Sequence, residues 1–196
     1  MFNYELIPGQ RLIFTDLAEK LGVSRTPVNN ALCLLAKKGF LDFTPNHGYL
    51  VHQITREEAD SLYELRLILE LGAVDKAVAN LTSGKLEKLE RKGKAFQDAV
   101  AQNVNRGRFL LDEDFHVHLV EMSGNLHMAE YFREAYERIF LRHRLGPQRG
   151  DRLQQILLEH QEIVNAIRAR DVGRTREAIK HHVTAGKEYI YSFIFN

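Results

Sequence analysis

Four polar side chains in the second half of the chain have the residue types and spacing of a metal-ligand set. Asp112 and His116 are four residues apart, so they lie on one side of one helix. His160 and His182 each fall within an apolar series at helical spacing, which turns both imidazoles towards the interior of a helical bundle. Three imidazoles and one carboxylate suit zinc, nickel, copper or iron, so the set predicts a divalent metal site.

The two later histidines are also matched in height if their helices form a hairpin. Asp171 separates the two helical patterns, with His160 11 residues before it and His182 11 residues after it. At roughly 1.5 Å per residue, both imidazoles would lie about 16 Å from the turn, at the same level. The spacing therefore favours one metal ion bound by both rings.

A less specific interpretation stays open for these residues. A histidine on an apolar stripe is more often a hydrogen-bonded core residue than a metal ligand, and the four side chains would then form a buried polar network. Four further histidines are expected at surface or edge positions: His118, His127, His143 and His181.

Six helical patterns must position these side chains. Thr55 and Glu58 form a capping box that opens the first pattern, which runs to about residue 81. The others are expected at about 84–103, 107–122, 126–145, 151–170 and 173–193, with breaks at 123–125, 146–150 and 171. No strand pattern follows residue 52, so residues 53–196 are predicted to form an all-α antiparallel helical bundle.

The N-terminal part has the pattern of a helix-turn-helix. One short helix is expected over 14–21, and a second from Ser24 or Thr26 to a stop at residue 39. Ala18 would lie where the two helices cross, Gly22 in the turn, and Val28 behind the second helix. Such a motif places its second helix in the major groove of DNA.

A hairpin pattern completes this unit. Strands are expected at 40–44 and 48–52, joined by a Pro-Asn-His-Gly turn at 45–48. The predicted fold is therefore mainly α, with an N-terminal winged helix-turn-helix DNA-binding domain at 1–52. An α-helical effector-binding and dimerisation domain is predicted at 53–196.

The composition limits the class of protein. The single cysteine, Cys33, rules out a disulfide framework and is expected to pack within the second helix. No apolar run approaches the roughly 20 residues of a membrane span, and the N-terminus lacks a signal-peptide pattern, so we expect a cytoplasmic protein without a membrane partner. The net charge of the chain is only +1, so the electrostatic share of DNA affinity should be small.

Several motifs resemble the GntR superfamily of bacterial transcription regulators. They are LIPGQRL at 6–12, LGVSRTPV at 21–28, Ala-Leu at 31–32 and NHGYLV at 46–51. The second half resembles the FadR-like branch with an FCD effector domain, through D-x-x-F-H at 112–116, SGN at 123–125, EH at 159–160, AIRARD at 166–171 and His182.

This resemblance implies a metal site and an effector. Its ligands would be Asp112, His116, His160 and His182, which would bind one divalent metal beside a small carboxylate effector. Zinc is the expected metal, with nickel or another transition metal as the alternative. Effector contacts are expected from Arg66 and Asn125, although Arg66 has two interpretations. It either forms a surface ion pair with Glu64 or points into the bundle as a carboxylate clamp.

The resemblance also implies a DNA-binding surface. Arg25, Thr26, His47 and Gly48 match DNA-contacting positions of the family. The second helix reads Val-Asn-Asn-Ala-Leu at 28–32, where the family has V-R-E-A-L, and Phe-Thr at 14–15 replaces acidic and arginine residues. Asn29 therefore stands in for an arginine and is expected to hydrogen-bond an adenine edge.

These features predict a ligand-responsive bacterial transcription regulator and not an enzyme. It would bind double-stranded operator DNA as a homodimer, because a two-fold operator requires a two-fold protein, and would sense a small organic acid at the metal. The alternative is a metal-dependent enzyme or small-acid binding module that retains a vestigial winged helix, since a metal with open positions can also activate water.

Overall fold

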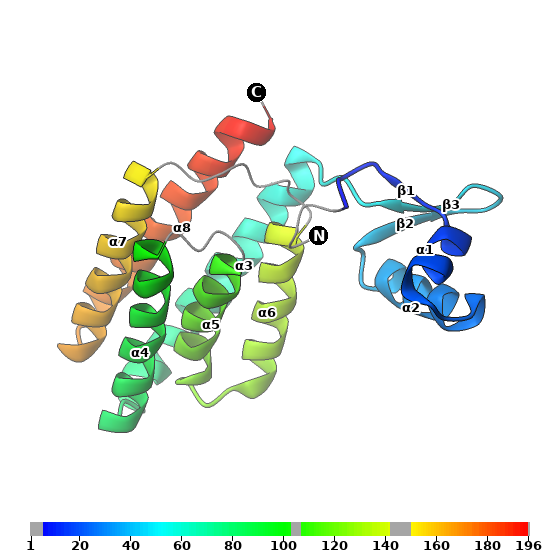
Figure 1. Ribbon diagram of the computed structural model, residues 1–196. Helices are drawn as coiled ribbons and strands as arrows, with labels where there is room; N and C mark the ends of the chain where they lie inside the picture. Colours follow the sequence, from blue (N-terminus) through cyan, green and yellow to red (C-terminus); the bar gives the residue numbers. More distant parts are fainter. Residues whose placement is uncertain (1–5, 103–106, 142–149, 196) are drawn as a thin grey trace.

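The computed structural model describes residues 6–102, 107–141 and 150–195. Figure 1 shows a small α+β unit beside a larger group of long helices, and the two are joined by the short segment before α3. The predicted fold class, a winged helix-turn-helix followed by a helical bundle, is confirmed.

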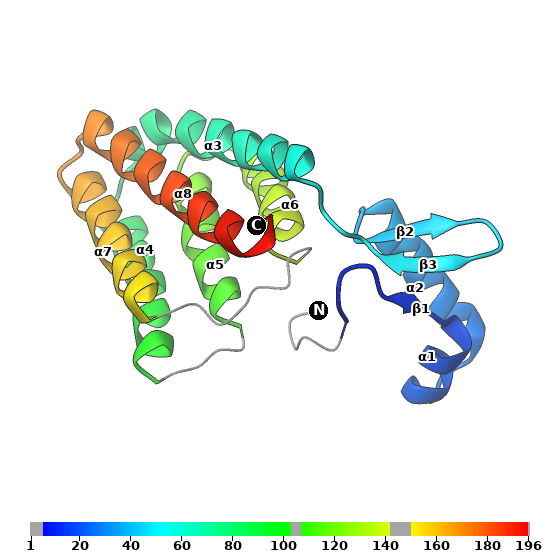
Figure 2. The ribbon, with the colours of Figure 1, turned by 90° about the horizontal axis from the view of Figure 1, so that it is seen from above.

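The small unit is a winged helix. Its elements are β1 (Arg11–Leu12), α1 (Phe14–Leu21), α2 (Arg25–Lys37), β2 (Leu41–Thr44) and β3 (Gly48–Val51). The three antiparallel strands have the order β1-β3-β2, as Figure 2 shows. β1 is not predicted by the sequence, because two residues carry no alternating pattern. It forms only because Leu12 pairs with Tyr49 of the wing.

The helix-turn-helix has the predicted internal contacts. Gly22 ends α1 with φ of 66°, a left-handed conformation that glycine adopts without a steric penalty. Ala18 and Val28 are both buried in the core of this unit. Cys33 corrects a prediction, because it is exposed and only its Sγ contact with the Tyr49 hydroxyl, at 2.8 Å, connects it to the core of this unit. The buried side of α2 is formed by Val28 and Leu32, so the next residue along the helix faces outwards.

Among the described residues, six helices follow the winged helix. They are α3 (Arg56–Ala79), α4 (Ser83–Ala101), α5 (Arg108–Glu121), α6 (Leu126–Leu141), α7 (Gly150–Arg168) and α8 (Val172–Ile194). Each packs on two neighbours in the order α3, α8, α7, α4, α5, α6 and back to α3, and α5 also contacts α3. The predicted cap is confirmed, since the Thr55 side chain accepts a hydrogen bond from the Glu58 backbone N–H.

Some predicted boundaries lie outside the described residues. They are the end of the second bundle helix at 103, the end of the fourth at 145, most of the break at 146–150, and His143. None of the described helices is long and apolar enough to cross a membrane.

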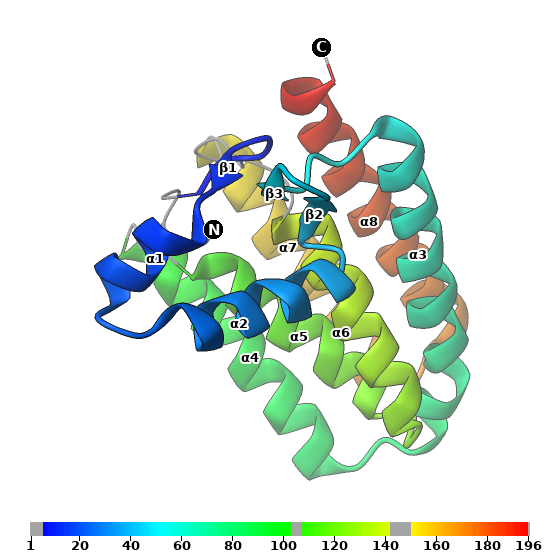
Figure 3. The same ribbon diagram turned by 90° about the vertical axis from the view of Figure 1, so that its right-hand side faces the viewer.

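One polar contact connects the winged helix with the bundle. Figure 3 shows the winged helix in front of the bundle, with the end of β3 leading directly into α3. His52, between the two, contacts Asp42 of β2 through Nδ1 at 2.8 Å and Glu58 of α3 through Nε2 at 2.7 Å. Its imidazole therefore bridges a carboxylate of the wing and a carboxylate of the first bundle helix.

Candidate metal centre

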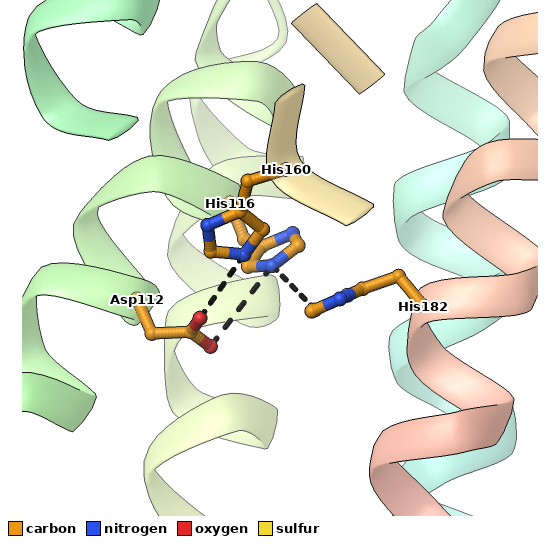
Figure 4. Close-up of side chains that lie close together, drawn as sticks. All are labelled: Asp112, His116, His160 and His182. Atoms are coloured by element: carbon orange, nitrogen blue, oxygen red, sulfur yellow. Dashed lines mark hydrogen bonds and ion pairs between the residues drawn. The ribbon is translucent and has the colours of Figure 1, made fainter. Parts of the chain in front are cut away.

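The four predicted ligands meet inside the bundle. Asp112 and His116 come from α5, His160 from α7 and His182 from α8, and Figure 4 shows their side chains converging. One potential ligand atom from each residue lies within 4.8 Å of all the others. The hairpin argument is also confirmed as geometry, because the His160 and His182 ring centroids lie 4.9 Å apart.

Two of the imidazoles face each other through Nε2. The Nε2 atoms of His116 and His182 lie 2.9 Å apart, while each Nδ1 faces a buried carboxylate. His116 Nδ1 lies 2.5 Å from Glu70 Oε1, and His182 Nδ1 lies 2.8 Å from Glu159 Oε2. An ionised carboxylate can only accept, so both Nδ1 atoms donate, and a neutral imidazole in this orientation has a lone pair at Nε2.

His160 is buried without a good hydrogen bond. Only 3% of the residue is exposed, and neither ring nitrogen makes a hydrogen bond of acceptable geometry with the described residues. Its Nε2 lies 3.1 Å from Asp112 Oδ1. The ring is held by packing, stacked on Phe115 with centroids 4.3 Å apart and edge-on to Phe96 at 5.3 Å.

The protonation states of the cluster suit a cation. Burial lowers the pKa of His182 to about 3, against the opposing hydrogen bond to Glu159. Burial also lowers the pKa of His160. Burial opposes ionisation of Asp112, but the neighbouring His160 outweighs it and holds the pKa of that carboxyl well below its usual range. Neutral imidazoles and an ionised carboxylate are the forms that bind metal.

These residues fit one divalent ion. Zinc bonds nitrogen and oxygen ligands at about 2.0–2.2 Å, so two ligands on one ion lie roughly 3–4 Å apart. The contacts of 2.9 Å between Nε2 atoms and 3.1 Å between His160 and Asp112 are close to that separation. A cation at the centre would also separate the two facing lone pairs of His116 and His182, which repel each other without one.

Of the two orientations considered for Arg66, a surface ion pair with Glu64 or a side chain pointing into the bundle, the structure has the second. It is 2% exposed, and its Nε lies 3.6 Å from Glu70 Oε2, whereas Glu64 is exposed. The guanidinium also lies over the ring of Tyr136, 4.9 Å from the centroid. The Tyr136 hydroxyl donates to Asp112, so Arg66 borders the cluster directly.

Asn125 is not among the four clustered residues, and its effector contact stays a prediction. Its side chain accepts a hydrogen bond from the Met128 backbone N–H at 3.1 Å and thereby caps α6. About 13 Å of helix separate Asp112 from the end of α5 at Glu121, and Asn125 follows that end.

The predicted DNA-contacting residues lie on the surface of the winged helix. Arg25, Thr26 and Asn29 are exposed on α2, His47 is exposed in the wing turn, and Gly48 is partly exposed at the start of β3. Asn29 also has a neighbour that the sequence did not suggest, since the Tyr49 hydroxyl lies 3.5 Å from its Oδ1.

His118 is a second correction to the sequence-based expectations. It is buried, with Nε2 3.2 Å from the Lys85 carbonyl oxygen and Nδ1 3.3 Å from Glu121. His118 lies two positions from His116, and both are buried because α5 is covered on several sides by α3, α4 and α6.

Sequence reasoning also missed the groups around the ligands. They are Glu70, Tyr136, Arg152 and Glu159, all buried except for small fractions of their surface. Two signals were available, because Glu70 follows Arg66 by one helical turn and Glu159 directly precedes His160.

The fold and the cluster define a DNA-binding protein with a second, all-helical domain that carries a buried histidine–carboxylate site. Residues 3–51 match the family described as "Bacterial regulatory proteins, gntR family", and residues 61–185 match the family described as "FCD domain". The chain therefore belongs to the GntR family of bacterial regulatory proteins, in the group with an FCD domain.

Individual relatives support the same class. The chain is 29% identical over 186 residues to YdhC of Bacillus subtilis, an uncharacterized HTH-type transcriptional regulator, covering 94% of this chain and 81% of YdhC. It is 37% identical over 138 residues to the Nta operon transcriptional regulator of Aminobacter aminovorans, covering 70% of this chain and 65% of the relative. The structure of McbR/YncC from E. coli superposes with a TM-score of 0.84 at 25% identity, over 97% of this chain and 91% of the other. The protein is thus a transcription regulator of the GntR type, whose helix-turn-helix is its DNA-binding part.

Proposed function

We propose that this regulator binds a small carboxylate effector at a divalent metal held by Asp112, His116, His160 and His182, and that the effector changes its affinity for operator DNA. Zinc is the proposed metal, with nickel or another transition metal as the alternative. The chain is proposed not to be an enzyme, since its relatives are named as transcriptional regulators.

One observation carries the metal assignment. The Nε2 atoms of His116 and His182 are 2.9 Å apart although both Nδ1 atoms face carboxylates. Such a contact is favourable only with a cation between the rings, either a proton or a metal ion. Burial lowers the pKa of His182 to about 3, which disfavours a proton on that ring at neutral pH, and the convergence of His160 and Asp112 on the same point favours a metal ion.

A bound metal would supply a positive charge and open coordination positions that attract an anion. Arg66 is the proposed second contact for the carboxylate of the effector, because its guanidinium is buried beside Tyr136, the hydrogen-bond partner of Asp112. Asp112 is the least buried of the four ligands, with 13% of its side chain exposed, so we place the entry for a small molecule on its side.

On the DNA side, we propose that Arg25, Thr26 and Asn29 face the major groove and that the wing residues His47 and Gly48 approach the backbone or minor groove. The support is the exposure of these residues on α2 and at the wing turn. Arg and Asn are side chains that read base edges by hydrogen bonds.

A homodimer is proposed because a single winged helix contacts too little DNA for specificity. The face shared by α3 and α6 is a suitable interface. Three large side chains there are strongly exposed: Leu65 at 42%, Ile68 at 60% and Tyr131 at 62%. Exposed apolar side chains on two helices that pack together favour contact with a second copy of the chain.

Metal analysis of the purified full-length chain tests the central assignment. We expect about one equivalent of a transition metal after purification without chelators, and less than a tenth of that in the double variant His160→Ala, His182→Ala. His127→Ala is the matched control, because this imidazole is 90% exposed and faces only Glu130.

A second measurement connects the metal to DNA. Gel-shift titrations with the DNA upstream of the gene, with and without zinc and a panel of small organic acids, should show an affinity that changes only when metal and acid are both present. A wild-type protein without metal, or a double variant with a full equivalent, would overturn the metal assignment.

A further inference from the structure

Two of the three imidazoles are hydrogen-bonded to buried carboxylates that do not belong to the four proposed ligands. Glu70 of α3 receives the Nδ1–H of His116 at 2.5 Å, and Glu159 of α7 receives the Nδ1–H of His182 at 2.8 Å. Glu70 is 0% and Glu159 9% exposed, so neither carboxylate is surrounded by water. Their oxygens therefore have few partners other than the imidazoles and the nearby guanidinium groups.

Each carboxylate is in turn held by an arginine. Arg152 donates from both terminal nitrogens to Glu159, at 2.5 and 3.0 Å, in a bidentate arrangement. The Nε of Arg66 lies 3.6 Å from Glu70, in a looser ion pair. Buried ion pairs contribute little net stability, because desolvation of the charges offsets their attraction. An orienting role explains these two pairs better than a contribution to folding.

The third imidazole lacks this arrangement. No hydrogen bond to His160 Nδ1 is formed by the described residues, and the ring is held by Phe115 and Phe96. Packing fixes the plane of a ring but does not decide which nitrogen carries the proton. The three histidines therefore differ in how well their donor atom is defined before a metal arrives.

We propose that Glu70 and Glu159 are positioning residues that hold His116 and His182 as the Nδ1–H tautomer, so that both Nε2 lone pairs are directed to one point. The inference rests on the metal site proposed above. Carboxylates in this position also make the imidazole more basic, so its Nε2 binds a metal more strongly. Loss of such a carboxylate typically weakens metal binding about 10–100-fold.

Glu70 has a further consequence for the connection to DNA. The four proposed ligands come from α5, α7 and α8, whereas α3, which follows the segment from the winged helix, supplies none. Glu70 connects α3 to a proposed ligand directly, through its hydrogen bond with His116. A change in the orientation of His116 is therefore passed to α3 through this hydrogen bond.

The first test measures the tautomers in the metal-free full-length protein. Nitrogen-15 NMR of the histidine rings distinguishes Nδ1–H from Nε2–H. We expect the Nδ1–H form at His116 and His182 in the wild type, and a detectable Nε2–H population at His116 in Glu70→Gln and at His182 in Glu159→Gln. The amide of glutamine can donate as well as accept, so it no longer enforces one tautomer.

The second test measures zinc affinity by competition with a fluorescent chelator. Glu70→Gln and Glu159→Gln should each raise the dissociation constant about 10–100-fold. Glu113→Gln is the matched control, since Glu113 is also buried but faces Arg133, and it should change the constant less than threefold. If a glutamine variant does not fold, aspartate at the same position keeps the charge but is too short to reach the ring, and the same weakening is expected.

The outcomes separate the two proposals. Dissociation constants within threefold of wild type for both glutamate variants, or Nε2–H tautomers at both rings in the wild type, would overturn the positioning role. If the wild type binds no zinc, the metal assignment fails, but the ring spectra still decide whether the two carboxylates fix the tautomers.

Discussion

Replacing His160 with phenylalanine distinguishes a ligand from a structural histidine. The imidazole is buried and stacks on Phe115; its Nδ1 has no hydrogen-bond partner among the described residues, and its Nε2 has only the poorly aligned contact with Asp112 at 3.1 Å. Leaving a buried polar group unsatisfied costs about 1–3 kcal/mol. Phenylalanine keeps the stacking and removes both nitrogens, while its larger ring costs about 1 kcal/mol or more in overpacking. The metal-free variant should therefore be more stable than the metal-free wild type, by about 1 kcal/mol.

For a chain of this length, that difference raises the melting temperature by about 2–4 °C. Thermal unfolding in the presence of a chelator and then with excess zinc measures both effects. Zinc at 100 times its dissociation constant should stabilise the wild type by about 2.7 kcal/mol and the variant hardly at all. His118→Phe is the matched control, and it should destabilise the protein because this imidazole has two polar contacts, with Lys85 and Glu121. A metal-free His160→Phe protein clearly less stable than wild type would show that the nitrogens are satisfied and refute the reasoning.

Three further results are expected. Burial lowers the pKa of His182 to about 3 from the ordinary value near 6.5, so the unfolded state takes up the proton first. The metal-free protein should keep this contribution to stability above about pH 6.5 and lose it as the pH falls towards 3. Urea unfolding at several pH values measures the free energy of unfolding, and greater stability in acid would contradict the prediction. Arg25→Ala should weaken operator binding in gel shifts by roughly 1–3 kcal/mol if the arginine reads a base, and unchanged binding would remove it from the interface. His52→Ala removes the bridge between Asp42 and Glu58, so proteolysis between the two domains should become faster without a change in the melting of the bundle; an unchanged cleavage rate argues against the bridge.

Local patterns in the sequence were sufficient for the elements and for the ligand set. Helical spacing of apolar residues, the Thr55 cap and Gly22 in the turn are signals of short range, and each gave an element that the structure contains. The ligand set followed from the same regularity, because an i,i+4 pair and two positions equidistant from a turn determine which faces can meet. The strand β1 has no such signal, since two residues become a strand only by pairing with β3.

The sequence alone thus determined that a winged helix precedes a helical bundle. It also determined that three histidines and an aspartate point into the interior of that bundle. It did not determine what surrounds them. Glu70 reaches His116 from 46 residues away, and the inward position of Arg66 depends on Tyr136 of a different helix. Such contacts depend on which helices become neighbours and at what height, and no periodicity within one helix encodes that. The tertiary structure therefore decided which imidazole nitrogens face the centre of the cluster, because the partners of the other nitrogens come from other helices.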